Sequence, residues 1–219
     1  MYPNLNEEKI LWKKGFKCVV GLDEVGIGPL AGPVVAAAVL VKCNAKIFAK
    51  NFGVRDSKKF SAMQREKLYK VLTNHKDIEW GIGIVSEKII DKINILEATK
   101  LAMVKAAKDI GIKEIDFLIL DGNFKIDTSR LRQGFGEPKQ KSVIKGDEKI
   151  FSCAAASIIA KVTRDNLMEK YDKKYPNYGF KKHKGYPTKA HFTSLEEFGP
   201  CPIHRKSFYP ISQHKLSTS

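Results

Sequence analysis

The sequence lacks the cysteine pattern of a disulfide-stapled or zinc-bound protein. It has four cysteines in 219 residues, with no CxxC pair and no Cys and His cluster at zinc-ligand spacing. We therefore expect free thiols, a reducing compartment and no structural zinc. Long hydrophobic runs are also missing, because the longest, residues 34–41, has only the length of a strand. The first residues lack the basic-then-apolar pattern of a signal peptide. These absences predict a cytoplasmic protein without a membrane segment.

Acidic residues are scarce relative to basic ones. The chain has 24 Asp and Glu against 39 Lys and Arg, which gives a net charge of +15 and a pI of about 9.6. The other bulk properties are ordinary, with 43% hydrophobic and 29% charged residues, so we expect one folded domain or a domain with an appended lobe. The excess positive charge favours a polyanionic partner such as nucleic acid, and a membrane surface is the weaker alternative.

Two of the scarce carboxylates stand side by side in an unusual setting. Asp23 and Glu24 follow residues 16–22, which have the pattern of a buried strand, and precede a turn rich in Gly and Pro. An isolated Asp-Glu pair is most often a solvated turn. At a strand end, however, such oxygens suit Mg²⁺ or Mn²⁺, and two such ions can support phosphodiester cleavage.

The hydrophobic pattern predicts an α/β chain in which Asp23 meets a second aspartate. Strands are expected at residues 16–22, 34–41, 78–85, 115–120 and 141–145, and helices at 61–75, where Ser61 and Gln64 have the form of a capping box, and from Asn94 to Gly111. The first two strands should be antiparallel, whereas the fourth follows a crossover helix and should run parallel to a neighbour. If that neighbour is the first strand, Asp121 emerges beside Asp23 at the carboxyl edge of the sheet.

A further carboxylate, Asp147, stands near the start of a helix of small residues, 154–160, which can pack close to the sheet. The free N–H groups of a helix start favour a carboxylate, so a helix cap and a metal ligand are equally supported. Residues 127–140, which precede it, are rich in Arg, Gly and Lys and are expected to form an irregular loop.

The composition changes from about Lys170 onward. This part has ten Lys or Arg against three Asp or Glu, interleaved with aromatic residues. Basic groups neutralise phosphates and aromatic rings stack on sugars or bases, although most of these rings should fill the core of a small lobe. Tyr186 differs, because it lies between Gly185 and Pro187 in a polar loop. We divide the chain into a catalytic domain, 1–170, and a basic helical lobe, 171–219.

The motifs resemble those of ribonuclease HII, an endonuclease that cuts the RNA strand of RNA/DNA hybrids and cuts at ribonucleotides embedded in DNA. The resemblance covers residues 19–210, and its carriers in chain order are Asp23-Glu24-Val25-Gly26-Ile27-Gly28-Pro29-Leu30-Ala31-Gly32-Pro33, Asp56-Ser57-Lys58-Lys59, Ile93-Asn94-Ile95-Leu96, Asp121-Gly122-Asn123, Lys145-Gly146-Asp147, the helix 155–165 and His183-Lys184-Gly185-Tyr186-Pro187-Thr188. It implies an RNase H-like fold: a mixed five-stranded sheet flanked by helices and followed by a small C-terminal helical lobe.

The resemblance also implies a site. Asp23, Glu24, Asp121 and Asp147 would be the catalytic carboxylates and would hold two Mg²⁺ or Mn²⁺ ions, with products that carry 5′-phosphate and 3′-hydroxyl ends. It favours Asp147 over Asp165, which could instead pair with a nearby base. The turn Gly26-Ile27-Gly28, Lys58 and Tyr186 would bind the substrate, the turn by reading the 2′-OH and Tyr186 by packing on a sugar on the DNA side. The expected partners are RNA/DNA hybrids and ribonucleotide-containing DNA, bound by a monomer.

The sequence departs from the family at Ile27, where an arginine is usual. We expect 2′-OH readout to persist and affinity near the cut phosphate to weaken; the alternative is that Ile27 packs inward. Two other functions compete with this one. Ribonuclease HIII also lacks the arginine, but residues 29–33 have the HII pattern and few residues precede the first strand. A non-catalytic nucleic-acid-binding protein would fit the charge, but it would gain nothing from clustered acids.

Overall fold

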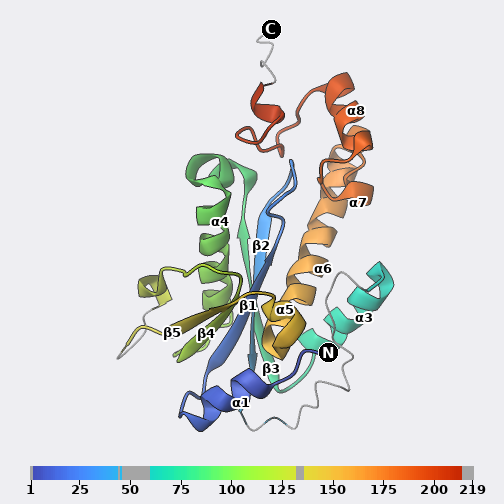
Figure 1. Ribbon diagram of the computed structural model, residues 1–219. Coiled ribbons are helices and arrows are strands. Elements are labelled where there is room, and N and C mark those ends of the chain that lie inside the picture. The colour runs from blue at the N-terminus through green and yellow to red at the C-terminus, as the bar shows by residue number, and fades with distance from the viewer. Residues whose placement is uncertain (1, 44, 46–59, 132–135, 214–219) are drawn as a thin grey trace.

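A mixed five-stranded sheet forms the centre of the protein, as predicted (Figure 1). The computed structural model describes residues 2–43, 45, 60–131 and 136–213. The strands are β1 (Val19–Val25), β2 (Val34–Val41), β3 (Ile78–Val85), β4 (Phe117–Asp121) and β5 (Lys139–Val143), in the order β3-β2-β1-β4-β5. β1 pairs with β2 in the antiparallel sense and with β4 in the parallel sense, which confirms both predicted pairings.

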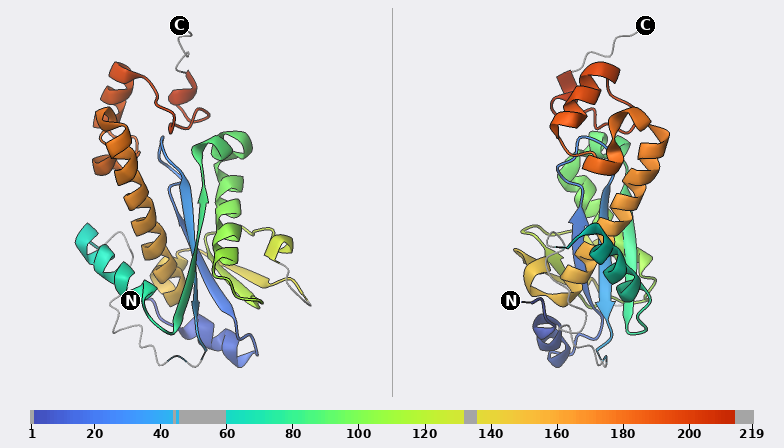
Figure 2. Two further views of the ribbon diagram at one scale, coloured as in Figure 1. Left: turned by 180° about the vertical axis from the view of Figure 1, so that it is seen from behind. Right: turned by 90° about the vertical axis from the view of Figure 1, so that its right-hand side faces the viewer.

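Helices cover both faces of the sheet, as Figures 1 and 2 show. α4 (Glu87–Asp109) packs on one face, and α6 (Phe151–Lys174) with α3 (Ala62–Thr73) packs on the other; α1 (Asn6–Lys13) lies at the end where β1 begins. The close fit of α4 depends on Gly83 of β3, because a Cβ there would lie 1.8 Å from the carbonyl oxygen of Ala102. Small residues in α6, such as Ala155 and Ala156, pack with Val35 and Ala37 of β2 on the other face.

β1 begins and ends three residues later than its hydrophobic pattern predicts. Its expected start is displaced because the backbone N–H groups of Lys17 and Cys18 are bound by the Asp116 carboxylate instead of a strand. Its end is extended because pairing with β2 continues through Asp23 and Glu24, whereas pairing with β4 stops at Leu22. The two acids therefore lie on an ordered strand edge and not in a turn.

The helix predicted from Asn94 begins earlier, at Glu87. Asn94 has the left-handed φ of 65° inside α4, and its side-chain oxygen accepts the N–H of Glu97 at 3.1 Å. The predicted capping interaction of Asn94 is thus present, but a first helical segment precedes it across the kink. α3 begins as predicted, since Ser61 and Gln64 form a capping box, and it ends at Thr73.

The remaining boundaries differ by a few residues. β4 begins two residues later than predicted and includes Asp121, and β5 begins at Lys139, inside the segment expected to be a loop. That segment also contains a 3-10 turn, η2 (Thr128–Leu131). Asp147 lies in a separate short helix, α5 (Gly146–Lys149), which an extended residue, Ile150, separates from α6.

Short helices after α6 form a lobe at the far end of the sheet (Figure 2). They are η3 (Pro176–Tyr178), α7 (Phe180–His183), α8 (Lys189–Phe198) and η4 (Ile211–Gln213). Tyr178, Phe180 and Leu195 are buried in their shared core, which confirms that the aromatic residues mostly serve packing. The predicted boundary between the catalytic domain and the lobe, at residues 170 and 171, falls inside α6, which is continuous there. The division into these two parts stays a prediction. In the described part of the chain, no helix has the length and apolar character to cross a membrane.

Candidate active site

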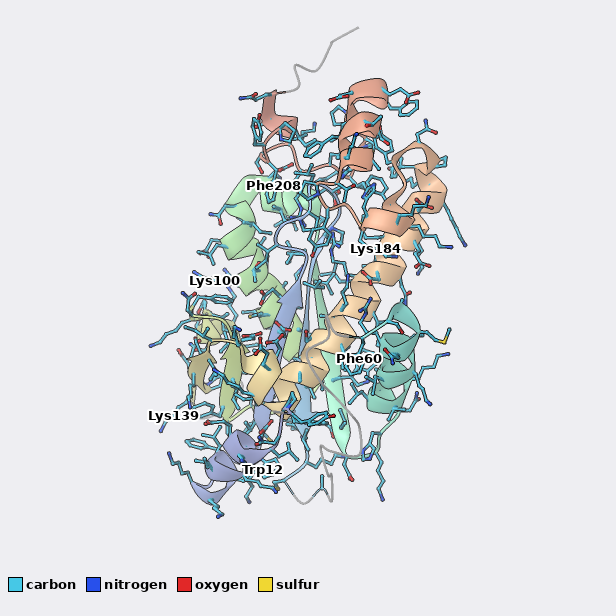
Figure 3. The ribbon with its side chains drawn as sticks, turned by 45° about the vertical axis from the view of Figure 1, so that its right-hand side comes forward. Trp12, Phe60, Lys100, Lys139, Lys184 and Phe208 are labelled. Atoms are coloured by element: carbon cyan, nitrogen blue, oxygen red, sulfur yellow. The ribbon has the colours of Figure 1, made fainter. Side chains whose placement is uncertain are left out.

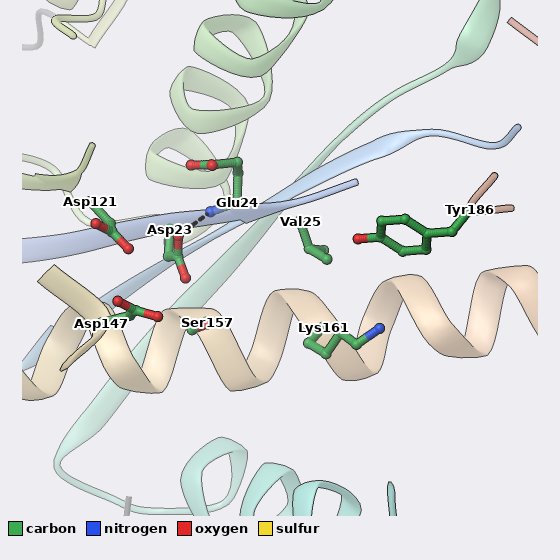
Figure 4. Close-up of a pocket in the computed structure, with 8 residues that line it drawn as sticks. All are labelled: Asp23, Glu24, Val25, Asp121, Asp147, Ser157, Lys161 and Tyr186. Atoms are coloured by element: carbon green, nitrogen blue, oxygen red, sulfur yellow. Dashed lines mark hydrogen bonds between the residues drawn. The ribbon is translucent and has the colours of Figure 1, made fainter. Parts of the chain in front are cut away.

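Three aspartates from three elements converge at the carboxyl edge of the sheet. Leu22 on β1 is in register with Leu120 on β4, so the next residues, Asp23 and Asp121, lie side by side. Asp147 reaches the same point from α5, and one carboxylate oxygen of each aspartate lies within 4.8 Å of the others. Figure 4 shows the three side chains gathered at one place. The strand order therefore gives the predicted meeting of Asp23 and Asp121, and Asp147 joins them.

The aspartates line one end of a pocket of about 190 Å³. Glu24 also lines the pocket. Because it follows Asp23 directly in the strand, its side chain points to the opposite side of β1 (Figure 4). The other lining residues are Val25, Ser157, Lys161 and Tyr186. The pocket thus holds acids at one end and Tyr186 at the other (Figure 4). Lys58 falls outside the described residues.

Backbone hydrogen bonds fix the carboxylates. Oδ1 of Asp23 accepts the N–H of Glu24 at 2.7 Å. Oδ1 of Asp121 accepts the N–H of Gly146 at 2.9 Å, which ties the end of β4 to the start of α5. Because α5 carries Asp147, this bond helps to hold Asp147 near Asp121. Asp147 is therefore neither an exposed cap nor remote from the pair.

Burial and like charges act on the carboxylates of the cluster. Burial, and then the charges of Glu24 and Asp121, hold the pKa of Asp23 well above its ordinary value, which a hydrogen bond from Ser157 only partly opposes. Three converging carboxylate oxygens are the hard donors that Mg²⁺ and Mn²⁺ prefer, and a divalent ion would remove the repulsion among them. The donor set therefore fits the ions that the sequence suggests.

A buried arginine holds the turn that follows Glu24. Arg205 is fully buried, and its guanidinium donates to the carbonyl oxygens of Gly26 at 2.6 Å, Ile27 at 2.9 Å and Gly32 at 3.0 Å. Gly26 has a φ of 98°, which a residue with a Cβ adopts only under strain. The Ile27 side chain is 43% exposed, so the alternative that it packs inward is wrong.

A second buried arginine, Arg164 of α6, holds the next part of the same loop. It donates to the carbonyl oxygens of Pro33 at 3.0 Å and Ala31 at 3.1 Å, and to that of Lys184 at 2.9 Å. Its guanidinium also lies 5.9 Å from the centre of the Tyr186 ring. Arg164 therefore joins the turn after β1 to the loop that carries Tyr186. Neither arginine is predicted from the sequence as a functional residue, although Arg164 lies within the family motif at residues 155–165.

Tyr186 lies at the surface of the pocket, as its polar setting predicts, with 38% of its area exposed. Its backbone oxygen is 3.0 Å from Nδ1 of His191, and Nε2 of His191 is 2.9 Å from Nε2 of buried His204. These contacts through His191 and His204 anchor the loop that carries Tyr186 to the core of the lobe. A Cβ at Gly28 would lie 3.9 Å from the Tyr186 ring, so the turn and the tyrosine are direct neighbours.

Asp165 takes no part in the aspartate cluster. Its carboxylate accepts from Lys161 at 2.7 Å, which is the pairing with a nearby base that the sequence offers as the alternative to metal binding. Lys161 itself lines the pocket and was not identified from the sequence. Its position four residues after Ser157 on one helix face was the available signal.

Comparison with known proteins identifies the family. The sequence model of ribonuclease HII matches residues 20–211. The chain belongs to the ribonuclease HII family. It is 51% identical to ribonuclease HII of Chlamydia caviae over 94% of this chain and 91% of that relative, and 49% identical to that of Acetivibrio thermocellus over 92% of this chain and 73% of that relative. The family consists of endoribonucleases of the RNase H type that cleave the RNA of RNA/DNA hybrids.

Solved structures agree with this assignment. Ribonuclease H2 of Pyrococcus horikoshii superposes with a TM-score of 0.71 at 29% identity, over 89% of this chain and 95% of that one. The RNase HII of Archaeoglobus fulgidus, solved in a complex with PCNA, gives 0.69 at 26% identity, over 87% and 95% of the two chains. A Bst-RNase HIII solved with Mn²⁺ gives a TM-score of 0.63 at 20% identity, over 90% and 68%, which shows the shared fold alone. The RNase H-like fold is thus confirmed, and the HIII alternative is the weaker one.

Proposed function

We propose that this ribonuclease cuts on the 5′ side of ribonucleotides embedded in DNA as well as within RNA/DNA hybrids, leaving 5′-phosphate and 3′-hydroxyl ends. The observation that carries the proposal is the shared pocket, which has an aspartate cluster at one end and Tyr186 beside the Gly26 to Gly28 turn at the other. The first end suits hydrolysis of a phosphodiester, and the second suits recognition of one sugar and its neighbour. We further propose that one chain suffices, because the aspartate cluster and Tyr186 meet in one pocket within a single chain.

The carboxylates would hold the metal ions. Asp23, Asp121 and Asp147 supply the converging oxygens, and Glu24 would complete the set from the other side of β1. When bound, Mg²⁺ or Mn²⁺ lowers the pKa of a coordinated water and stabilises the departing 3′ oxygen. The protein's own contribution is to keep the donors in place, through the hydrogen bonds of Asp23 to the Glu24 N–H and of Asp121 to the Gly146 N–H.

The turn and Tyr186 would select the position of the cut. Arg205 locks the Gly26 and Ile27 carbonyls, so the main chain of the turn meets the substrate in one conformation. A rigid main chain without side-chain bulk at Gly28 can approach the 2′-OH closely, and that hydroxyl is what distinguishes RNA from DNA. The adjacent Tyr186 ring would pack on the following deoxyribose. Lys58 would add a basic contact.

A cleavage assay tests the proposal. A labelled DNA duplex with one ribonucleotide is incubated with Mg²⁺ or Mn²⁺, and the product ends are mapped. We expect one cut 5′ of the ribonucleotide with a 3′-hydroxyl on the upstream fragment, and none with Asp121→Asn. Binding of the duplex without cleavage in either metal would instead favour the non-catalytic nucleic-acid-binding function.

A further inference from the structure

One cation lies inside the proposed active site. Among the described residues that line the pocket, Lys161 of α6 is the one basic side chain. Figure 4 shows it along α6 between Ser157, which bonds to Asp23, and Tyr186 at the other end. The exposed turn offers no cation of its own, because its central residue is Ile27. Lys161 therefore lies along the pocket between the aspartate cluster and Tyr186.

Lys161 is not an ordinary surface lysine. Its side chain is 23% exposed and its partner Asp165 is 16% exposed, with 2.7 Å between Nζ and Oδ1. A lysine that precedes an acid by four residues is the less stabilising order of such a pair in a helix. Burial lowers the pKa of Lys161, and the hydrogen bond that Lys161 donates to Asp165 opposes this shift. The pair is thus poorly suited to stabilise the helix and well suited to hold one ammonium group in one position.

The pattern along α6 supports a role toward the substrate. Ser157, Lys161 and Arg164 occur at intervals of four and three residues, which places them on one helix face. Ser157 bonds to the Asp23 carboxylate and Arg164 bonds to the loop carbonyls of Ala31 and Pro33. The two neighbours of Lys161 on this face therefore serve the aspartate end and the sugar-binding end of the pocket.

We propose that Lys161 binds the backbone phosphate on the 3′ side of the ribonucleotide, one phosphate after the one that is cut, and that Asp165 is a positioning residue for it. The inference rests on the proposed function, because it takes the aspartate cluster and Tyr186 as the two ends of the substrate path. An ammonium group neutralises a phosphate as a point charge without reading the base. Lys161 would thus supply, from α6, the cationic contact that Ile27 in the turn cannot supply.

The salt dependence of binding tests this contact directly. Affinity for a duplex with one ribonucleotide is measured against salt concentration, at one fixed Mg²⁺ concentration, with all variants in an Asp121→Asn background that prevents cleavage. Loss of one phosphate contact lowers the slope of log affinity against log salt by about one. We expect this for Lys161→Met, with an affinity loss of about fivefold, which is the size of one partly exposed charged contact. Lys161→Arg should keep most of the slope.

A matched control separates the contact from net charge. Lys13→Met removes the same charge from α1, at the other end of β1, and should leave the slope unchanged. Equal slopes for Lys161→Met and Lys13→Met, in proteins with normal thermal unfolding, would overturn the proposal. If Lys161→Met fails to fold, two other results would overturn the proposal. One is a salt slope in Lys161→Gln equal to that of the protein with Lys161, and the other is a slope in Lys161→Arg that is lowered by about one.

Asp165 is tested by coupling and by steady-state cleavage. Asp165→Asn should raise KM with little change in kcat, and adding it to Lys161→Met should cause no further loss, because it acts only through Lys161. Additive losses would refute the positioning role. A wild-type protein that binds the duplex but cleaves no substrate would refute the proposed function instead, while the salt slopes would still report on Lys161.

Discussion

Replacing Asp121 by asparagine should stabilise the metal-free protein while it abolishes cleavage. The side chain keeps its shape and its Oδ1 can still accept the Gly146 N–H, so the link between β4 and α5 survives. The change removes one of the charges that raise the pKa of Asp23. Two unit charges 4.8 Å apart, the limit of the aspartate cluster, repel by roughly 3 kcal/mol at an effective dielectric constant of about 20.

Partial exposure of Asp121 reduces this figure, so we expect a gain of about 1–2 kcal/mol in the free energy of unfolding. For a chain of this size that corresponds to a rise of about 2–8 °C in Tm. The gain depends on pH. The folded protein holds a proton on Asp23 that the unfolded chain releases above pH about 3.9. The cost of the cluster is therefore absent in acid, grows as pH rises and is complete above the folded-state pKa of Asp23.

Thermal unfolding with EDTA, and then with increasing Mg²⁺ or Mn²⁺, measures both effects. Metal should stabilise the wild type more than the variant, because ligands stabilise the state that binds them. Asp116→Asn is the control, because Asp116 lies outside the aspartate cluster and an asparagine oxygen there can still accept the N–H groups of Lys17 and Cys18, so its Tm should not rise. The reasoning fails if Asp121→Asn melts at or below the wild type in metal-free neutral buffer.

Three further changes test the fold and the turn. Gly83→Ala should lower Tm by roughly 6–12 °C, or about 3 kcal/mol, because its Cβ would meet the Ala102 oxygen at 1.8 Å; Gly136→Ala, with nothing within 4 Å, should leave Tm unchanged in the same melt. Arg205→Lys keeps the charge but loses donors to three carbonyls, so it should cost about 3 kcal/mol in a denaturant titration and reduce the preference for a lone ribonucleotide over a long hybrid. Ile27→Arg should tighten binding or speed cleavage at a lone ribonucleotide by about threefold at low salt, and an equal rate at every salt concentration would contradict it.

The strand pattern predicts the aspartate cluster because the cluster depends on pairing. Residues 16–22 and 115–120 are continuous apolar segments, and the parallel pairing of the two strands is enough to place Asp23 beside Asp121. Asp147 is harder to predict, because a carboxylate near a helix start has a structural reason to be there. Its position depends on α5, a single turn that follows Lys145, and the left-handed conformation of Lys145 is not signalled by the local sequence.

The two arginines lay beyond prediction for a different reason. Arg205 is 179 residues from Gly26, and neither its polar neighbours nor its distance in the chain indicates a buried guanidinium that donates to backbone carbonyls. The early start of α4 was hidden likewise, because the sound capping signal at Asn94 belongs to the second of two helical segments that a kink joins. Local patterns predict each element well where no distant residue competes for its backbone.

The buried arginines change what Ile27 implies. Among the described residues, neither Arg164 nor Arg205 forms an ion pair. Both guanidinium groups donate hydrogen bonds to neutral carbonyl oxygens of the loop after β1. Burial lowers the pKa of Arg205 to about 9, so the group is still protonated at neutral pH. Two positive charges without a carboxylate in direct contact therefore lie behind the loop that would meet the phosphate backbone, in a medium that screens them less than water does. Because this field persists whatever residue occupies position 27, an arginine there adds one exposed, salt-screened charge to an existing potential, and the expected gain from Ile27→Arg is for that reason small.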